Sequence, residues 1–360
     1  MCALRWTLRA RVAHATISRK VTLKSAKIAT LRSARRAGIF SAVKDSKWRT
    51  QRLLILCYHG ISFKDEHLWS PALYIEASRF RERMQFLRDG GYNVLPLDEA
   101  LRRLADGTLP LRSVAITFDD GGLSFSELAM PVLRDFGFPS TVYLATYYCR
   151  NQLPVFDVTT SYLIWKGQGK IADYRQLFKE CEPYPVGEGV AAVQQWWRKS
   201  VAALQPSAAE KDELAARLAA QMGLDYSEML SSRMFHLMDP GEVAGVAREN
   251  VTIELHTHRH RTPRDKSLFQ REIVDNRNGI LEITGKNPVH FCYPSGVYYP
   301  EYFSWLRETG VESATTCESG FASRGQESMR IPRLLDTTSL STVEFEGWLT
   351  GVSAGLPQRR

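Results

Sequence analysis

The nine residues VAITFDDGG, at positions 114–122, decide how this chain is expected to fold. Their first half is a continuous apolar run, which is typical of a strand buried on both faces of a parallel sheet. Their second half places two adjacent carboxylates, Asp119 and Asp120, at the point where that strand ends. In parallel α/β folds the carboxyl ends of the strands share one face, which holds the active site. The stretch therefore predicts a parallel sheet with a polar site at its edge.

Similar short apolar runs recur along the chain, and stretches with helical periodicity separate most of them. We expect further strands at residues 53–57, 92–95, 140–145, 251–255, 289–293, 311–316 and 330–335. We expect one helix to follow the N-cap Ser78 and to stop at Gly90, and others at residues 98–106, 124–136, 267–284 and 300–309. Repeated β–α units of this kind predict a parallel sheet, either doubly wound or closed into a barrel.

Two segments depart from this alternation. Residues 150–238 show several helical patterns and no convincing strand, and one of the helices opens with a capping box formed by Ser207 and Glu210. We interpret this range as a helical insertion in a single barrel domain that spans residues 53–355. Residues 1–52 form a separate basic N-terminal segment.

Charge is distributed unevenly between these parts. Residues 1–52 carry 14 Lys and Arg and a single acid, Asp45, whereas the rest of the chain carries 33 basic and 38 acidic groups. The mildly acidic body argues against a nucleic-acid partner. The basic segment lacks the apolar region of a secretory signal. It suits an organelle transit peptide, a stretch that lies on an anionic membrane surface, or a solvated, partly helical tail.

The cysteines indicate the compartment. Six of them, at positions 2, 57, 149, 181, 292 and 317, show no C-x-x-C pattern and no regular spacing, which is typical of free thiols in a reducing compartment. No run of 18 apolar residues predicts a membrane-spanning helix. We therefore expect a cytoplasmic protein, with a peripheral position at the inner membrane face as the alternative.

Four polar clusters each begin where an expected strand ends, so they are expected to meet on one rim. They are YHG at 58–60, DDGG at 119–122, HTHRH at 256–260 and CYPSG at 292–296. His256 and His260, with one carboxylate, complete the two-His, one-acid set of a catalytic zinc site, although such a set also accepts cobalt, nickel or iron. The second carboxylate is then free to act as a base toward water activated by the metal.

Each cluster also has a simpler structural explanation when it is taken alone. A D-D-G sequence is commonly a turn with solvated acids, and His59 suits a core histidine that bonds to backbone groups. His258 is expected to point away from the site. Cys57 and Cys292 lie inside apolar strands, where inert packing is the favoured role.

Two motifs resemble those of the polysaccharide deacetylases, carbohydrate esterase family four, with nodulation-factor chitooligosaccharide deacetylase homology. TFDDG at 117–121 is similar to the first motif of this family, and HTHRH at 256–260 to its H-[S/T]-x-x-H second motif. The resemblance implies a distorted (β/α) barrel of about seven parallel strands. It also implies a metal-dependent hydrolase of carbon–nitrogen bonds other than peptide bonds, which removes acetyl groups from N-acetylated sugars of a polysaccharide, oligosaccharide or lipid-linked glycan.

Roles for individual residues follow from the same resemblance. Asp119 would be the general base, and Asp120, His256 and His260 would hold a divalent metal, usually zinc. Thr257 would steady the loop that carries the two imidazoles.

The third and last motifs bring further residues and two departures. A backbone N–H near Tyr293 and Ser295 would help to hold the oxyanion. Cys292 stands where the family has an arginine that orients the catalytic acid, and the last motif lacks its general-acid histidine. We predict that Arg333 replaces the arginine by steadying Asp119, and that His59 protonates the leaving amine.

Three alternatives to an N-deacetylase stay open at this point. The first is a catalytically degenerate family member that binds glycan without hydrolysis. The second is an O-acetyl esterase, whose metal chemistry would be the same. The third is an interaction protein organised by the basic segment.

Overall fold

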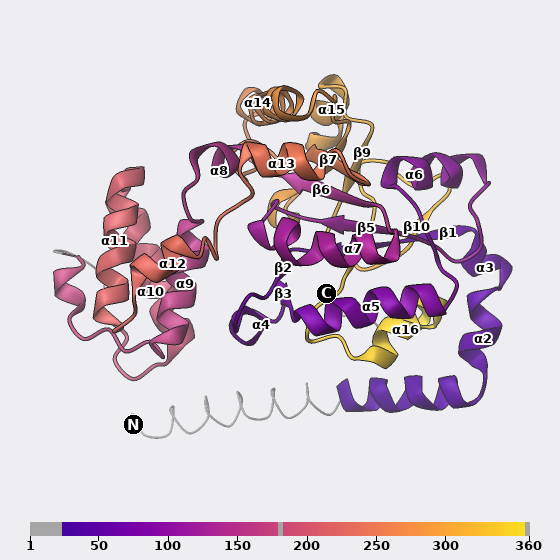
Figure 1. Ribbon diagram of the computed structural model, residues 1–360, viewed down its shortest axis with the longest axis horizontal. Helices are drawn as coiled ribbons and strands as arrows, with labels where there is room; N and C mark the ends of the chain where they lie inside the picture. The colour runs from indigo at the N-terminus through magenta and orange to yellow at the C-terminus, as the bar shows by residue number, and fades with distance from the viewer. Residues whose placement is uncertain (1–23, 179–182, 357–360) are drawn as a thin grey trace, which may run out of the picture.

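A computed structural model describes residues 24–178 and 183–356 of the chain (Figure 1). A curled, mostly parallel sheet lies at its centre, with strand order β10-β1-β5-β6-β7-β8-β9. These strands are β10 (Ala322–Ser323), β1 (Arg52–Tyr58), β5 (Ser113–Phe118), β6 (Ser140–Leu144), β7 (Val251–Leu255), β8 (His290–Cys292) and β9 (Ser313–Thr315). The expected fold class, a distorted α/β barrel, is confirmed.

Three further pairings curl the sheet toward closure. The short strand β4 (Asn93–Val94) pairs with β5, and β11 (Leu334–Leu335) pairs in parallel with β1, at the other end of the sheet from β9. Thr315 of β9 forms a bridge with Ile331, three residues before β11. The two ends of the sheet are thereby joined through residues 331–335. Each of the expected strands is present, although those at 92–95, 289–293, 311–316 and 330–335 are shorter than expected.

Helices pack around this sheet. They are α5 (Ala77–Asp89), α6 (Leu97–Asp106), α7 (Met130–Phe136), α13 (Pro240–Val246), α14 (Lys266–Thr284), α15 (Glu301–Glu308) and α16 (Thr342–Thr350). All of them except α13 and α16 lie in ranges where a helix is expected from the sequence. The N-cap prediction for Ser78 is wrong, because α5 begins one residue before it and follows Glu76. The helix expected from residue 124 opens as a π-helical turn (Phe125–Ala129). Pro131 explains this turn, since it has no N–H for the carbonyl four residues earlier.

Alternate residues of the central strands face two different cores. Leu54 and Leu56 of β1 pack with the surrounding helices, in a cluster that also holds Phe80 and Met84 of α5. Leu53 and Ile55 point the other way, into a cluster inside the barrel to which α6 also contributes buried side chains. This burial on both faces is the physical reason why the strands read as unbroken apolar runs.

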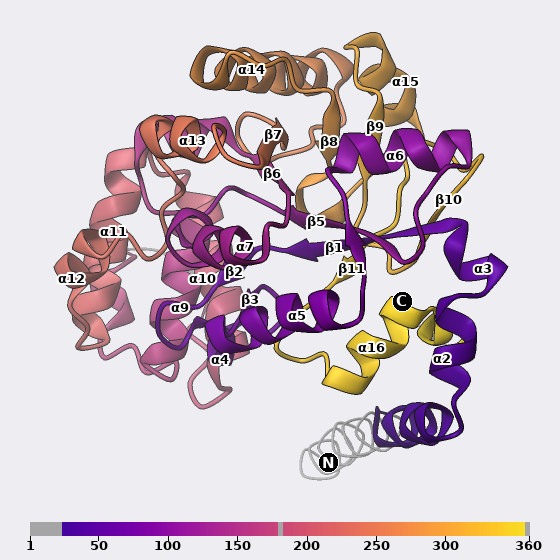
Figure 2. The ribbon, with the colours of Figure 1, turned by 45° about the vertical axis from the view of Figure 1, so that its right-hand side comes forward.

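The range 150–238 is helical in its described residues and packs on a core of its own. Its main helices are α9 (Phe156–Lys166), α10 (Val190–Leu204), α11 (Ala208–Gln221) and α12 (Tyr226–Ser231), and α8 (Thr146–Asn151) leads into it from β6. Trp196 and Trp197 lie buried in its centre. The expected capping box of Ser207 and Glu210 is present. These helices stand together at one side of the barrel (Figures 1 and 2).

The insertion returns to the barrel at the acidic motif. Leu237 forms an antiparallel bridge with Gly122, and the N–H of Leu123 donates to the carbonyl of His236. The last residues of the insertion therefore lie directly beside the carboxyl end of β5.

Part of the basic segment belongs to the folded body. Residues 24–36 are helical and are followed by α2 (Ile39–Lys44) and α3 (Lys47–Thr50). Phe40 of α2 is buried against Gly347 of α16. Arg49 is fully buried, and its guanidinium donates to the carbonyls of Leu349 and Ser113. A solvated tail is therefore the wrong description for residues 39–52, because they cover the edge of the barrel.

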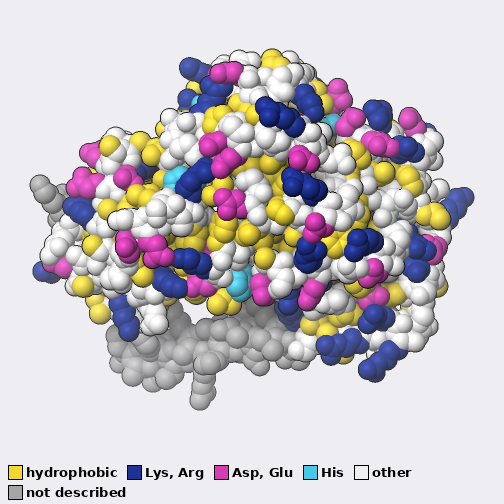
Figure 3. Space-filling view, viewed as in Figure 1, with side chains coloured by type: hydrophobic (Ala, Val, Ile, Leu, Met, Phe, Trp, Pro, Cys, Tyr) yellow, Lys and Arg dark blue, Asp and Glu magenta, His cyan; other side chains and the backbone are white. Residues whose placement is uncertain are grey.

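The surface combines both signs of charge over the barrel. On the face shown in Figure 3, Lys and Arg side chains alternate with Asp and Glu, and basic side chains gather at the lower right, where α2 lies in Figure 1. Within the described residues, no helix combines the length and the hydropathy needed to cross a bilayer. Cys57, Cys149, Cys292 and Cys317 are free thiols, as predicted, and Cys2 and Cys181 lie outside the described residues.

Candidate active site

Three side chains from two distant parts of the chain converge on one point at the carboxyl end of the sheet. Nε2 of His256 and Nε2 of His260 each lie 3.1 Å from Oδ1 of Asp120. The three ligand atoms of this group lie within 4.8 Å of one another. Donor atoms of a tetrahedral zinc ion, bonded at about 2.0–2.2 Å, are separated by similar distances. The predicted metal-ligand residues are thus brought together.

The hydrogen bonds of His256 favour a cation at this point. Nδ1 of His256 lies 2.8 Å from the carbonyl oxygen of Cys292, to which it donates a proton. In the neutral imidazole, Nε2 then presents a lone pair to the Asp120 carboxylate, which is an unfavourable contact. A metal ion between the two groups removes the conflict, since both would donate lone pairs to it. A histidine ligand whose other ring nitrogen bonds to a backbone carbonyl is the usual arrangement around zinc.

The electrostatics of the three groups are those of a cation site. Burial by itself would raise the pKa of Asp120, but the adjacent His260 and His256 outweigh it and hold that pKa well below its ordinary value. Burial would lower the pKa of His260, and the Asp120 carboxylate reverses the shift and raises it. A concentrated negative charge therefore faces two imidazole nitrogens.

The backbone of the acidic motif separates its two carboxylates. Asp120 adopts a left-handed conformation with φ +70, and Gly121 follows with φ +85. A Cβ on Gly121 would lie 2.4 Å from Cδ1 of Leu144, so only glycine fits at this position. Because of this turn, Asp120 points to the imidazoles while Asp119 points into the barrel.

Asp119 is buried and held by a bidentate ion pair. Nη1 and Nη2 of Arg333 lie 2.7 Å from Oδ1 and Oδ2 of Asp119, and Arg333 is itself fully buried. Burial by itself would raise the pKa of Asp119, but Arg333 outweighs it and lowers that pKa strongly. Arg333 thus occupies the position that its predicted role requires, beside a carboxylate that stays ionised.

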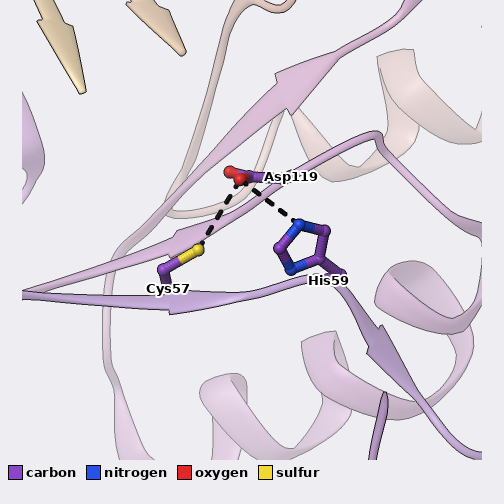
Figure 4. A group of neighbouring side chains, drawn as sticks. All are labelled: Cys57, His59 and Asp119. Carbon is purple, nitrogen blue, oxygen red and sulfur yellow. Dashed lines mark hydrogen bonds and ion pairs between the residues drawn. The ribbon is translucent and has the colours of Figure 1, made fainter. Parts of the chain in front are cut away.

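The opposite side of Asp119 is occupied by residues from β1 and its carboxyl end (Figure 4). Nε2 of His59 lies 3.7 Å from Oδ2 of Asp119, and the thiol of Cys57 contacts the same oxygen at 3.6 Å. The thiol of Cys292 approaches it at 3.4 Å. The two thiols therefore pack directly against the acid, which is a closer involvement than the inert packing expected of them.

The loop that carries the imidazoles is fixed by its own residues. Thr257 is fully buried in a left-handed conformation, with φ +60, and its hydroxyl oxygen accepts from the N–H of Arg261 at 3.0 Å. His258 points away from the metal-ligand group, as expected, because its Nδ1 lies 2.9 Å from Oγ1 of Thr146.

Two residues of α14 support the same loop, and neither was predicted from the sequence. Oδ1 of Asn276 accepts from the N–H of His256 at 2.8 Å, and its Nδ2 donates to the carbonyl of Leu144 at 2.9 Å. Glu272 accepts from the N–H of Arg259 at 2.8 Å and from Nε of Arg261 at 2.7 Å. The signal for both was their spacing of four residues on the otherwise apolar face of an expected helix.

The CYPSG cluster at 292–296 contributes one of its two predicted residues. Ser295 lies in the turn after β8 and lines the site. Tyr293 is buried and is not available to a substrate. Its N–H donates to the carbonyl oxygen of Thr315, and its hydroxyl donates to the carbonyl oxygen of Met329. Its prediction as an oxyanion donor is wrong, because an extended residue at the end of β8 uses its N–H within the sheet.

A cavity of about 440 Å³ opens beside these groups. His59, Asp120 and His260 line it on the barrel side, and residues 234–237 line it on the side of the insertion. This volume lies within the range of about 300–1,000 Å³ that is usual for small-molecule sites.

Comparisons with known proteins agree with this geometry. A family model described as polysaccharide deacetylase matches residues 229–314, a range that contains both imidazoles. Over this range the chain is similar to polysaccharide deacetylases. It is 34% identical over 94 residues to the polysaccharide deacetylase-like protein YxkH of Bacillus subtilis. It is 27% identical over 101 residues to the poly-beta-1,6-N-acetyl-D-glucosamine N-deacetylase of Escherichia coli strain K12.

These matches cover a limited part of each chain. They include 26% and 28% of this chain, and 32% and 15% of the two relatives. The chain therefore spans about a third or less of the curated relatives that it matches.

Solved structures of other proteins share the fold over a much larger part of the chain. A deacetylase of Streptococcus pyogenes, PplD in complex with acetate, is 16% identical with a TM-score of 0.55, and the likeness covers 82% of this chain and 96% of that one. IcaB from Ammonifex degensii is 18% identical with a TM-score of 0.54, covering 83% of this chain and 97% of that one. At such identities the likeness concerns the fold.

Proposed function

We propose that this protein is a metal-dependent N-deacetylase that hydrolyses the acetamide of N-acetylated sugars in a glycan. One observation carries the proposal: the Asp120, His256 and His260 group lies next to Asp119, a buried carboxylate that an arginine keeps ionised. A protein that only binds glycan has no need for this combination.

The residues of the chain divide the chemistry among them. Asp119, in contact with His59 on one side and Arg333 on the other, is the general base that takes a proton from the attacking water. His59 lines the cavity and protonates the leaving amine from the side of β1. Arg333 is a positioning residue, because it touches the carboxylate of Asp119 and is itself fully buried. Ser295 faces the cavity, where its N–H is the remaining candidate donor of the CYPSG cluster to the oxyanion.

The metal would be held by Asp120, His256 and His260. A divalent ion with three protein ligands supplies Lewis-acid polarisation of a carbonyl and lowers the pKa of bound water, and zinc is the usual ion for this donor set.

Metal content and amine release test the proposal together. The purified protein is expected to hold a divalent ion and to release amines from N-acetylglucosamine oligomers, and a chelator should abolish the release. Asp120→Asn and His260→Ala should lose both the ion and the activity. Asp119→Asn, which keeps all three ligands, should retain the ion and lose about 10²–10⁴ in kcat. Glycan binding with no amine release by the metal-loaded wild type would instead identify a degenerate family member.

The role of His59 is tested separately, because it is not a metal ligand in the proposal. His59→Ala should retain the ion and lose turnover on an acetamide. The loss should be much smaller on an acetate ester with a good leaving group, which needs little protonation. Equal losses on both substrates, or unchanged turnover on the acetamide, would show that another group is the general acid.

A further inference from the structure

The cavity beside the metal-ligand group continues into a second, larger one. The second cavity has a volume of about 710 Å³ and lies over the insertion. The two share four lining residues, Leu73, Asp157, Val158 and Ser295. Ser295 belongs to the barrel turn after β8, whereas Asp157 and Val158 belong to α9. A single groove therefore leads from the metal-ligand group onto the helical insertion, and we call it the insertion groove.

The walls of the insertion groove combine flat aromatic surface with polar groups. Trp165 of α9 is half-buried and lines the groove. Its ring packs against that of Tyr162, with the two ring centroids 5.7 Å apart. Gln194 and Arg198 line it from α10, with Ser161 from α9. Trp165 lies outside the core around Trp196 and Trp197 and packs at the edge of a smaller apolar cluster that contains Tyr162 and Phe235. It is only half-buried there, so part of its side chain stays open to the groove that it lines.

This combination fits sugar rings better than an acyl chain. A pyranose has an apolar C–H face, which suits an indole surface, and a rim of hydroxyls, which suits amide, carboxylate and guanidinium groups. An acyl chain would make no use of the polar groups of Asp157, Gln194 and Arg198, whereas sugar hydroxyls can bond to them. Continuity with the deacetylase site makes the sugars that follow the reacting unit the natural occupant.

We propose that the helical insertion extends the substrate site, and that the protein acts on an oligosaccharide chain whose further units lie along the insertion groove against Trp165. The proposal rests on the proposed deacetylase function for the position of the reacting unit. It adds the place where the units beyond the reacting one bind, which is the surface of the helical insertion that Trp165, Gln194 and Arg198 line.

Binding of a length series tests the insertion groove without turnover. The probes are N-acetylglucosamine oligomers, from the monomer to the pentamer, in β-1,4 and β-1,6 linkage, titrated calorimetrically into zinc-loaded Asp119→Asn protein. We expect the affinity to rise with length by at least about tenfold in one of the linkages. Equal affinity for the monomer and the pentamer, or no binding in either linkage, would overturn the proposal.

Substitutions at Trp165 locate the added affinity. In zinc-loaded Asp119→Asn protein, the further substitution Trp165→Ala should lower the affinity for the pentamer about three- to tenfold and leave the affinity for the monomer unchanged. Trp165→Phe should keep most of the affinity that the pentamer gains over the monomer. Arg198→Ala, at an exposed position of the same groove, should also weaken only the longer oligomers. Trp48→Ala is the matched control, since Trp48 is 41% exposed and lies on α3 at the opposite side of the molecule (Figure 2).

Turnover separates this proposal from the proposed function. In the wild type, kcat/KM should rise with oligomer length, and Trp165→Ala should remove the rise. Amine release that does not depend on length would contradict the insertion groove and leave the deacetylase function standing. Length-dependent binding without amine release would contradict the deacetylase function and leave the groove standing.

Discussion

At the scale of single residues, the pair of Asp119 and Arg333 is the most consequential contact of the site. Both side chains are buried, and the two hydrogen bonds of the pair run in parallel from one guanidinium to one carboxylate. A planar guanidinium matches a carboxylate in a way that a lysine ammonium does not. The pair therefore fixes the direction of the Asp119 carboxylate as well as its charge.

Removing Arg333 should damage stability and activity but leave metal binding intact. Arg333→Met leaves a buried carboxylate without its partner, and breaking such a pair costs about 3–5 kcal/mol of unfolding free energy. We expect kcat/KM to fall while the bound ion is retained, since none of its three ligands contacts Arg333. Arg333→Lys keeps the charge but loses the two parallel hydrogen bonds of the guanidinium. Relative to Arg333→Met, it should restore the unfolding free energy more fully than kcat/KM. Urea unfolding, metal analysis and kinetics measure the three effects, and unchanged kcat/KM in Arg333→Met would contradict the positioning role.

The same substitution should change the pH dependence. In the wild type the pKa of Asp119 is depressed, so its contribution to stability is present above its unfolded pKa of about 3.9 and is lost as the pH falls. Without Arg333, burial becomes the dominant influence and raises that pKa. The acid limb of the kcat/KM profile of Arg333→Met should therefore move to higher pH, and the stability deficit should be larger at pH 7 than near pH 4. If the kcat/KM profile of Arg333→Met had its acid limb at the same pH as that of the wild type, Arg333 would not control the pKa of Asp119.

At the scale of elements, α14 is more than a cover for the sheet. Its buried face mixes Phe269 and Ile273 with the polar Glu272 and Asn276. Asn276 joins the ends of two neighbouring strands, since it bonds to the carbonyl of Leu144 in β6 and to the N–H of His256 after β7. A buried polar side chain with all of these bonds made is favourable, and it holds a ligand-bearing loop in place.

Asn276→Ala should loosen this support. The N–H of His256 would lose its acceptor inside the protein, which costs about 1–3 kcal/mol. We expect the metal affinity to fall about 10–100-fold, as is typical when the support of a ligand is removed. Val274→Ala on the same helix is the control, because Val274 is 42% exposed and its truncation should change the stability by less than about 0.5 kcal/mol. Competition with a chromogenic chelator measures the affinity, and equal affinities in the two variants would contradict this role of α14.

At the scale of the whole molecule, two additions to the barrel have different relations to it. The insertion has its own core and borders the site, whereas the N-terminal helices bury single side chains, such as Phe40 against α16. Phe40 is 3% exposed, while its neighbour Ile39 is 44% exposed. The described part of the basic segment thus combines a face that is integral to the fold with one that faces solvent.

A pair of adjacent substitutions tests this arrangement. Phe40→Ala should lower the unfolding free energy by about 3–5 kcal/mol, because it leaves a cavity against α16. Ile39→Ala should change it by less than about 0.5 kcal/mol. Denaturant unfolding of the two variants gives both values. Similar, small effects would show that α2 is not part of the cooperative unit.

The sequence by itself determined the alternation of strands and helices, the helical character of residues 150–238 and the polar clusters at strand ends. These follow from local periodicity and from the rule that parallel strands place their carboxyl ends on one face. Only the tertiary structure decided that Asn276 of α14 bonds to His256, and that the N–H of Tyr293 bonds within the sheet. The same holds for Arg49, which bonds to the carbonyl of Leu349 at the edge of the barrel. Such contacts join residues far apart in the chain, and their geometry depends on how whole elements pack, which no local pattern encodes.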